Sequence, residues 1–303
     1  FSTADPTNKR LPDLGTNPLT GDTRLWAENF TAMELMNDHS TSNFWTIAHW
    51  WLTMVGRGFS PTMTAVTDTH KRWANVGGVP RTLVFVGDEH DDPMSFQRDV
   101  FARAINDDKA IGTNGPTFRI RLENTQGAQA ELGQTLDVRA DGKVTGIIDL
   151  EMPEWIEVDS LDIYFNREDV IVPPGEENDE EIAPNTSVDI DLDPQTDLEV
   201  VATGTVEHKR WKKQVSFSLE GVTEDTYIIV MVRGRKQGSR NMRPVVPENI
   251  RPLAFSNPIF LDADGDGYNN PPLKQLASVP PPIAPPSAMG AHVHADGTTH
   301  DHH

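Results

Sequence analysis

The spacing of apolar residues predicts alternating strands and helices in the first third of the chain. The segment TSNFWTIAHWWLTMVGRG, residues 41–58, repeats apolar side chains every three or four positions and ends in glycines, so it predicts a helix. A second amphipathic segment at 95–107, with Ser95 placed to cap it, predicts another helix. Short apolar runs around these helices predict strands at 30–37, 62–67 and 81–87. This order indicates an α/β layer.

A different pattern begins near residue 117. Short runs of alternating apolar and polar residues, separated by Gly, Asp and Asn, follow one another to about residue 260. This spacing predicts a β-sandwich, so the expected fold class is α/β plus all-β. The expected parts are an extended lead-in at 1–28, an α/β part at 29–116, the sandwich at 117–260, a calcium-type loop at 261–272 and a Pro/His-rich tail at 273–303.

Charge and cysteine content exclude several kinds of partner and chemistry. The chain has 303 residues, with 26 Lys and Arg against 46 Asp and Glu, a formal net charge of −20. Nucleic acids and anionic membranes attract basic surfaces, so neither is expected as a partner. The absence of cysteine excludes disulfides, thiolate nucleophiles and cysteine-based zinc sites. No apolar run reaches the roughly eighteen residues that a transmembrane helix needs, so no transmembrane segment is expected.

Asp68 and His70 follow the second expected strand, TMTAVT. Alternate residues of an extended chain project on one face, so the two side chains are expected to point the same way. In parallel α/β folds, ligands and catalytic groups lie beyond the carboxyl ends of the strands. A carboxylate beside an imidazole is a good pair of ligands for a divalent transition metal such as Zn, Mn or Fe. The alternative is that Asp68 caps a turn and His70 is an exposed loop residue.

The motifs around this pair occur in an order that resembles one enzyme family. They are Glu34 with Asn37, Arg57 with Gly58, Asp68 to His70, Pro80 with Arg81, and Thr113 to Pro116. This series resembles the final part of the PHP (polymerase and histidinol phosphatase) family, most closely its CehA/McbA-like metallohydrolase branch, although Thr67 replaces the usual Ser. The later PLAFSNPIFLDADGDG is similar to the end of secreted members of that branch.

The resemblance implies a fold, a chemistry and site residues. In such enzymes the D-x-H pair supplies the last ligands of a di- or trinuclear metal site in a distorted β/α barrel. The metals lower the pKa of a bridging water and polarise a phosphoryl, amide or ester group for hydrolysis. Carried over, Asp68 and His70 become metal ligands, and Asn37 and Arg57 become contacts to ligands or substrate. The part at 29–116 is then expected to be the C-terminal units of a PHP-like barrel.

One large departure from the family concerns the ligands of its N-terminal half. The H-x-H pair and further histidines expected there do not precede Glu34, and His49 is expected to be a packed core histidine. Because catalytic transition metals normally have at least three protein ligands, the isolated chain is expected to be inactive. The chain begins at Phe1, so we expect that an upstream part was removed.

Three explanations of the missing half remain open: a separate N-terminal chain, a fragment of a longer chain, or a retired enzyme with a structural role. We favour a complementing N-terminal chain or segment as the partner, because an incomplete barrel has a strand edge that must be covered. A homo-oligomer also stays open.

The segment DADGDGYNN resembles the first part of an EF-hand-type calcium loop. Three aspartates alternate, a glycine provides the sharp turn, and a carbonyl and an amide follow at ligand positions. The final position, where a bidentate Glu belongs, holds Leu273, so the loop either recruits an acid from elsewhere or binds weakly. An acidic turn without an ion is the alternative. The expected calcium ligands are Asp262, Asp264, Asp266, Tyr268 through its carbonyl, and Asn270.

These features favour a secreted metal-dependent hydrolase, with a phosphoester as the favoured substrate. Its expected location is extracellular, periplasmic or on the cell surface, since weak calcium sites fill outside the cell. One alternative is a non-catalytic, calcium-stabilised extracellular scaffold on a degenerate PHP fold. A second alternative is transition-metal binding by the tail histidines, which are His292, His294, His300, His302 and His303.

The tail alternative predicts the effect of a truncation. If the tail histidines hold all transition metal, deleting the chain from Pro280 onward will abolish zinc and nickel binding, because His-rich low-complexity segments bind such ions without a folded site. Equilibrium dialysis with metal analysis measures this. Retention of a tightly bound transition metal by the truncated chain would rule the tail out as the metal site.

Overall fold

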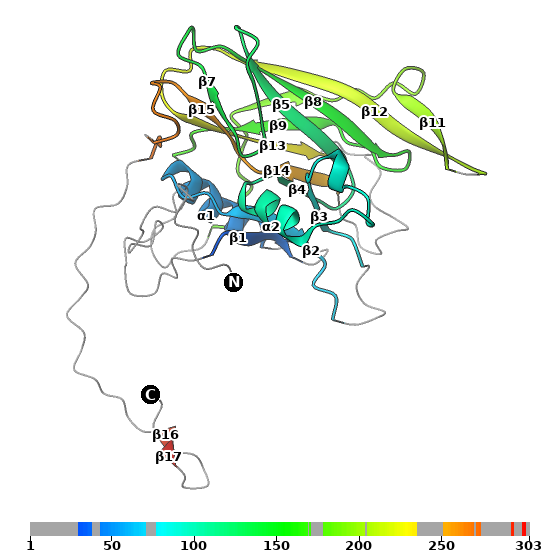
Figure 1. Ribbon diagram of the computed structural model, residues 1–303, viewed down its shortest axis with the longest axis horizontal. Helices are drawn as coiled ribbons and strands as arrows, with labels where there is room; N and C mark the ends of the chain where they lie inside the picture. Colours follow the sequence, from blue (N-terminus) through cyan, green and yellow to red (C-terminus); the bar gives the residue numbers. More distant parts are fainter. Residues whose placement is uncertain are drawn as a thin grey trace, which may run out of the picture.

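The computed structural model describes residues 30–37, 43–70, 77–168, 170, 178–203, 205–234, 251–269, 271–273, 292–293 and 299–300. Within these residues strands predominate, with two α-helices, and no sheet closes into a barrel. Figure 1 shows an outer five-stranded sheet, a central sheet beneath it, and a third layer that holds α1, β1 and β2. The predicted sandwich is confirmed, whereas the PHP-like barrel units stay a prediction.

The outer sheet is antiparallel in the order β11-β12-β8-β5-β6. Its two central strands, β5 and β8, alternate buried and more exposed residues, as the sequence pattern predicts for a sheet with one face on a core. From β5, Phe118, Ile120 and Leu122 enter that core. The bounds are β5 Thr117–Asn124, β6 Gln129–Glu131, β8 Val144–Pro153, β11 Leu198–Thr203 and β12 Val206–Leu219.

The central sheet has the order β10-β9-β13-β14-β4-β3, with β15 pairing β13 and β7 pairing β15. The strands β3 and β4 pair with each other antiparallel, and β4 pairs with β14. The sheet therefore combines strands from both sides of residue 116, where the sequence places a domain boundary. The bounds are β3 Arg81–Val84, β4 Ala110–Thr113, β7 Thr135–Asp137, β9 Ser160–Tyr164, β10 Thr186–Asp189, β13 Thr226–Arg233, β14 Leu253–Ser256 and β15 Ile259–Asp262.

Strand β13 is buried on both faces, because the central sheet lies between two cores. Ile228 and Val230 belong to the core between the two sheets. Tyr227, Ile229 and Met231 alternate with them and belong to a second core on the opposite face. The run TYIIVMV is therefore nearly all apolar, unlike a strand that faces water on one side.

The second core is formed with the third layer. Its helix, α1 (Phe44–Gly56), has the extent that the apolar spacing predicts. Trp51 is fully buried, and its ring centroid lies 6.2 Å from that of Phe255 in β14. His49 is a core residue, as predicted: it is 4% exposed, and its ring nitrogens lie 3.2 Å from the carbonyl oxygens of Val170 and Glu180.

The second helix, α2 (Arg98–Asn106), begins later than predicted. The prediction that Ser95 caps it is wrong, because Ser95 belongs to the preceding turn, where its hydroxyl donates to the carbonyl of Asp92 over 3.0 Å. Ala104 of this helix is buried, and Val100 and Ile105 are half-buried. Among the described residues, Phe96 and Phe101 of the predicted apolar stripe are exposed. The remaining short elements are η1 Asp88–His90, β16 His292–Val293 and β17 Thr299–His300.

The pairing partner of β1 (Ala32–Asn37) is β2 (Thr62–Val66), and the two strands are parallel. The backbone groups on the other edge of β2 are satisfied by side chains. The amide of Asn257 accepts from the N–H of Met63 (2.7 Å) and donates to its carbonyl (3.0 Å). The hydroxyl of Thr82 does the same for Ala65, at 2.9 Å in each direction. These two side chains attach the third layer to the central sheet.

Neither α-helix in the described ranges has the length and apolarity needed to cross a lipid bilayer.

Removal of the Asn257 amide should destabilise the protein. The residue is fully buried, and its amide also donates to the carbonyl of Ala110 (2.9 Å). Asn257→Ala leaves buried backbone groups of β2 without partners, which should cost about 2–4 kcal/mol of unfolding free energy. Urea denaturation measures this cost. The control Gln129→Ala removes an exposed amide bonded to Glu123 and should change stability by less than about 0.5 kcal/mol. Equal effects of the two substitutions would contradict the role assigned to Asn257.

Candidate functional site

The carboxyl ends of β1 and β2 lie together at one edge of the third layer. Parallel pairing places Asn37, the last residue of β1, opposite Val66, the last residue of β2. The amide of Asn37 donates to the carboxylate of Glu34 over 2.6 Å. Asp68 and His70 follow Val66 by two and four residues, so the chain carries them at the same edge as Asn37. This is the edge at which parallel α/β architectures place their ligands.

The backbone at Asp68 holds the D-x-H pair in a defined shape. Asp68 has a positive φ of 44°, a conformation that non-glycine residues adopt at a cost and that clusters at functional sites. Nδ1 of His70 lies 2.6 Å from the carbonyl oxygen of Asp68 and 3.5 Å from its Oδ1. When Nδ1 donates to that carbonyl, the lone pair of Nε2 is available to a metal. The side chains of His70 and Asp68 are 75% and 48% exposed.

Arg57 lies elsewhere. It is the residue after the last turn of α1, five positions before β2 begins, so it is on the side of the layer where β2 starts. Its side chain is buried, and this desolvation lowers the pKa of the guanidinium. The structure therefore brings Asn37 to the edge with Asp68 and His70 but does not bring Arg57 there.

The calcium-type loop is organised around Asp262, the last residue of β15. Its Oδ1 accepts from the N–H groups of Asp264 (3.2 Å) and Gly265 (2.5 Å), and its Oδ2 accepts from Gly267 (3.0 Å). The N–H of Asp266 donates to Oδ1 of Asp264 over 3.1 Å. Both glycines have positive φ values, 98° and 91°, as such a tight loop requires. The backbone thus turns the aspartates of the motif toward one another.

A further acid, Asp225, joins this loop. Carboxylate oxygens of Asp225, Asp262 and Asp264 all lie within 4.8 Å of one another, the one group of three or more acids or histidines in the described ranges that could hold a metal. Asp225 is 2% exposed, and its Oδ1 accepts from the N–H of Ala263 (3.1 Å). It immediately precedes β13, whose Thr226 pairs with Leu261 of β15. Asp225 is therefore the outside acid that a loop ending in Leu273 would require.

The loop concentrates negative charge. Desolvation, a hydrogen bond with Asp264 and the charges of Asp264, Asp225 and Asp262 raise the pKa of Asp266. Arg139 provides a counter-charge: its hydrogen bond to Asp137 raises its pKa, and the negative charges of Asp137, Asp262 and Asp264 add to this rise. Without an ion, neighbouring carboxylates repel one another, and a divalent cation would remove that repulsion.

The chain after the loop packs against the end of α1. The Tyr268 hydroxyl donates to the carbonyl of Val55 over 3.2 Å, and its ring centroid lies 4.5 Å from that of Phe260. The N–H of Leu273 donates to the carbonyl of Gly56 over 2.8 Å. A Cβ added to Gly56 would lie 2.8 Å from the Leu273 side chain, so a larger residue at this position would displace that side chain. The loop therefore connects the central sheet to the third layer.

Several predicted site residues lie outside the described part. Asn270, His294, His302 and His303 are among them. His292 and His300 lie in β16 and β17, which pair antiparallel, and the positions of their side chains are outside the description. The predicted roles of all these residues stay predictions.

Comparison of the chain with protein-family models and with curated proteins found no match. The interpretation of the chain as PHP-like therefore depends on the motifs and on the geometry of the β1–β2 edge.

The loop predicts opposite effects of one substitution with and without calcium. A raised carboxyl pKa means that Asp266 stabilises the fold below its ordinary pKa and that this contribution is lost as pH rises through the raised value. At neutral pH, Asp266→Asn should therefore raise the melting temperature in EDTA and lower it in millimolar Ca²⁺. Calorimetry measures both, with Asp193→Asn, in an exposed turn between β10 and β11, as control. A shift of the same sign in both buffers would indicate an acidic turn without an ion.

Proposed function

We propose that this protein is part of a secreted metal-dependent hydrolase of PHP type, acting on phosphoesters. The observation that carries the proposal is the parallel β1–β2 edge, where β1 ends at Asn37 and β2 leads into the Asp68–His70 pair. Strained backbone at Asp68 and an imidazole oriented by a carbonyl are features of built sites.

The donor set suits a divalent transition metal but is incomplete. A carboxylate and an imidazole are ligands for Zn, Mn or Fe, and two such donors fall short of the three that catalytic sites normally have. Asp68 and His70 would hold one side of the ion, and the Asp68 carbonyl would fix the ring of His70. Asn37, whose amide donates to Glu34, would orient a ligand or a substrate oxygen. A bound ion would supply Lewis-acid activation of water and of the phosphoryl group.

A complementing N-terminal segment would supply the remaining ligands. Two surfaces of the described chain support it. Among the residues that the structure describes, β1 pairs with β2 alone, and a further strand on its other edge would extend this sheet. Apolar side chains on and before α2 are also uncovered, with Met94, Phe96 and Phe101 exposed by 94%, 54% and 37%. Clusters of this kind mark contact surfaces.

The calcium-type loop favours a second candidate, a calcium-stabilised extracellular scaffold. Here Ca²⁺ bound by Asp225, Asp262 and Asp264 would hold β13, β15 and the third layer together through Tyr268 and Leu273. A calcium-bound loop is compatible with both candidates, and they differ in whether the β1–β2 edge holds a transition metal and catalyses hydrolysis.

Metal analysis and hydrolysis of bis(p-nitrophenyl) phosphate by the native protein, with any co-purifying chain, test the proposal. Asp68→Ala and His70→Ala should each lower kcat/KM at least about 100-fold, since even outer-shell partners of metal ligands are worth roughly 10–100-fold. Both variants should also lose transition metal.

His90→Gln is the matched control. His90 also lies beside an acid, with Nε2 3.9 Å from Glu89, but it belongs to η1 rather than to the β1–β2 edge. It should retain activity and metal. A preparation that contains calcium alone, with no transition metal and no hydrolysis, would support the scaffold and refute the hydrolase.

A further inference from the structure

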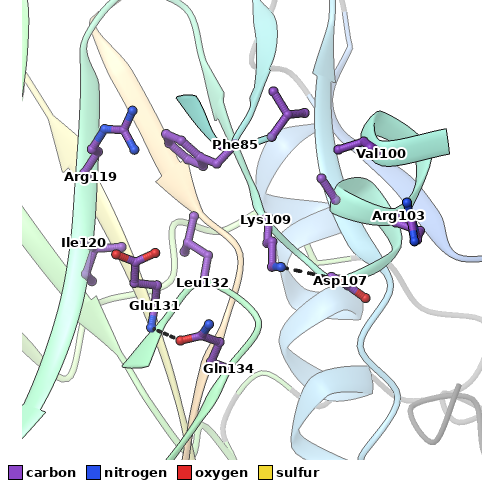
Figure 2. A pocket seen from close by; sticks show the side chains of 13 residues that line it. Phe85, Val100, Arg103, Asp107, Lys109, Arg119, Ile120, Glu131, Leu132 and Gln134 are labelled. Atoms are coloured by element: carbon purple, nitrogen blue, oxygen red, sulfur yellow. Dashed lines mark hydrogen bonds and ion pairs between the residues drawn. The ribbon is translucent and has the colours of Figure 1, made fainter. Parts of the chain in front are cut away.

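A cavity of about 490 Å³ lies between α2 and the edge of the sandwich formed by β5 and β6. Figure 2 shows its two walls, with Arg119 and Glu131 on one side and Val100 and Arg103 on the other. Its volume falls within the range of about 300–1,000 Å³ that small-molecule sites occupy.

The cavity is distinct from both sites described above. Thr82 bonds to Ala65 near the end of β2, the side on which Asp68 and His70 follow. Thr62, at the start of β2, instead bonds to the carbonyl of Ile105, within the α2 segment that lines the cavity. The cavity thus lies toward the opposite end of β2 and would not receive the substrate of the β1–β2 edge.

The inner surface of the cavity is apolar and preformed. Ala104, Ile120 and Leu132 are buried, and Phe85 and Val100 are half-buried beside them. The N–H of Phe85 donates to the carbonyl of Lys109 over 2.8 Å, which fixes the chain beyond β3 to the chain beyond α2. A ligand with an apolar body would therefore find a surface that needs little rearrangement.

The rim carries three cations, and one of them has an acidic partner. Lys109 pairs with Asp107 at 3.7 Å. Among the described residues, neither Arg103 nor Arg119 forms an ion pair; Arg103 donates to the carbonyl of Asp99, and the guanidinium of Arg119 lies 5.0 Å from the ring centroid of Phe85. Two arginines without carboxylate partners are notable in a chain with a net charge of −20.

We propose that this cavity binds a small organic monoanion, a carboxylate attached to an apolar body. The planar guanidinium of Arg119, which lies over the ring of Phe85, matches carboxylate geometry, and Ile120 and Leu132 on the same side receive the apolar part. Arg103, on the opposite wall, adds positive charge. The carboxylates of Glu131 and Asp107, on the two walls, disfavour ligands with a second negative charge. This site is independent of the proposed hydrolase.

Isothermal titration of the native protein with 3-phenylpropionate tests the site. Matched ligands are 3-phenylpropan-1-ol, which lacks the charge, and succinate, which lacks the ring and has two charges. Binding of 3-phenylpropionate should be saturable with one site per chain, and both matched ligands should bind at least about 10-fold more weakly, as expected for loss of a charge-assisted hydrogen bond or of apolar contact.

Substitutions locate the binding. Arg119→Gln should weaken binding of 3-phenylpropionate between about 10- and 100-fold. Arg103→Gln should weaken it less, and Val100→Trp should abolish it by filling the cavity. Arg98→Gln is the matched control, since Arg98 is on the same helix, is 89% exposed and does not line the cavity. Thermal melting confirms that each variant is folded.

The result that would overturn the proposal is equal binding of the carboxylate and the alcohol. Undetectable binding of 3-phenylpropionate would also overturn it. So would an affinity that is unchanged in Val100→Trp, Arg119→Gln and Arg103→Gln.

Discussion

A strand that lacks a neighbour on one side must find other partners for its backbone, and in this protein β2 finds them in two side chains. Asn257 pairs with both the N–H and the carbonyl of Met63, and Thr82 does the same for Ala65. These contacts reproduce the pattern of an adjacent strand, one residue pair at a time. They fix the position and direction of β2 against the central sheet. They therefore also fix where the chain that carries Asp68 and His70 leaves β2.

The central sheet provides the surface on which that attachment depends. Because this sheet is buried on both faces, alternate residues of β13 pack into different cores. Val230 packs into the core between the two sheets, and Ile229 packs into the core with the third layer. The same sheet carries the calcium-type loop, since β13 and β15 bring Asp225 beside Asp262. Scaffold and candidate sites thus share a small number of strands.

The sequence predicted the elements with strong periodicity and missed what non-local pairing determines. The helix α1 and the alternating strand β5 follow from apolar spacing alone. Ser95 was misassigned as a helix cap because a local turn at Asp92 competes for it. Asp225 lies 37 residues before Asp262 in the sequence. It carries no motif of its own, and only the register of β13 against β15 brings it to the loop.

The cavity was equally hidden from the sequence. Its walls come from α2, the chain beyond β3, and the strands β5 and β6, and no spacing rule connects these segments. Arg119 reads as an exposed strand residue and Arg103 as an exposed helix residue until the fold places both around one apolar space. Sites of this type are properties of tertiary structure rather than of motifs.

The sharing of one sheet by two cores has a consequence for how the chain can be divided. Strand β4 pairs with β14, although Leu253 lies 140 positions after Thr113, and β3 pairs with β4 in the same sheet. A cut near residue 116 would strip the sandwich of an edge and expose the lower face of β13 to water. The regions before and after residue 116, which differ in sequence pattern, should therefore unfold together as one cooperative unit. Neither region is expected to fold when it is expressed separately.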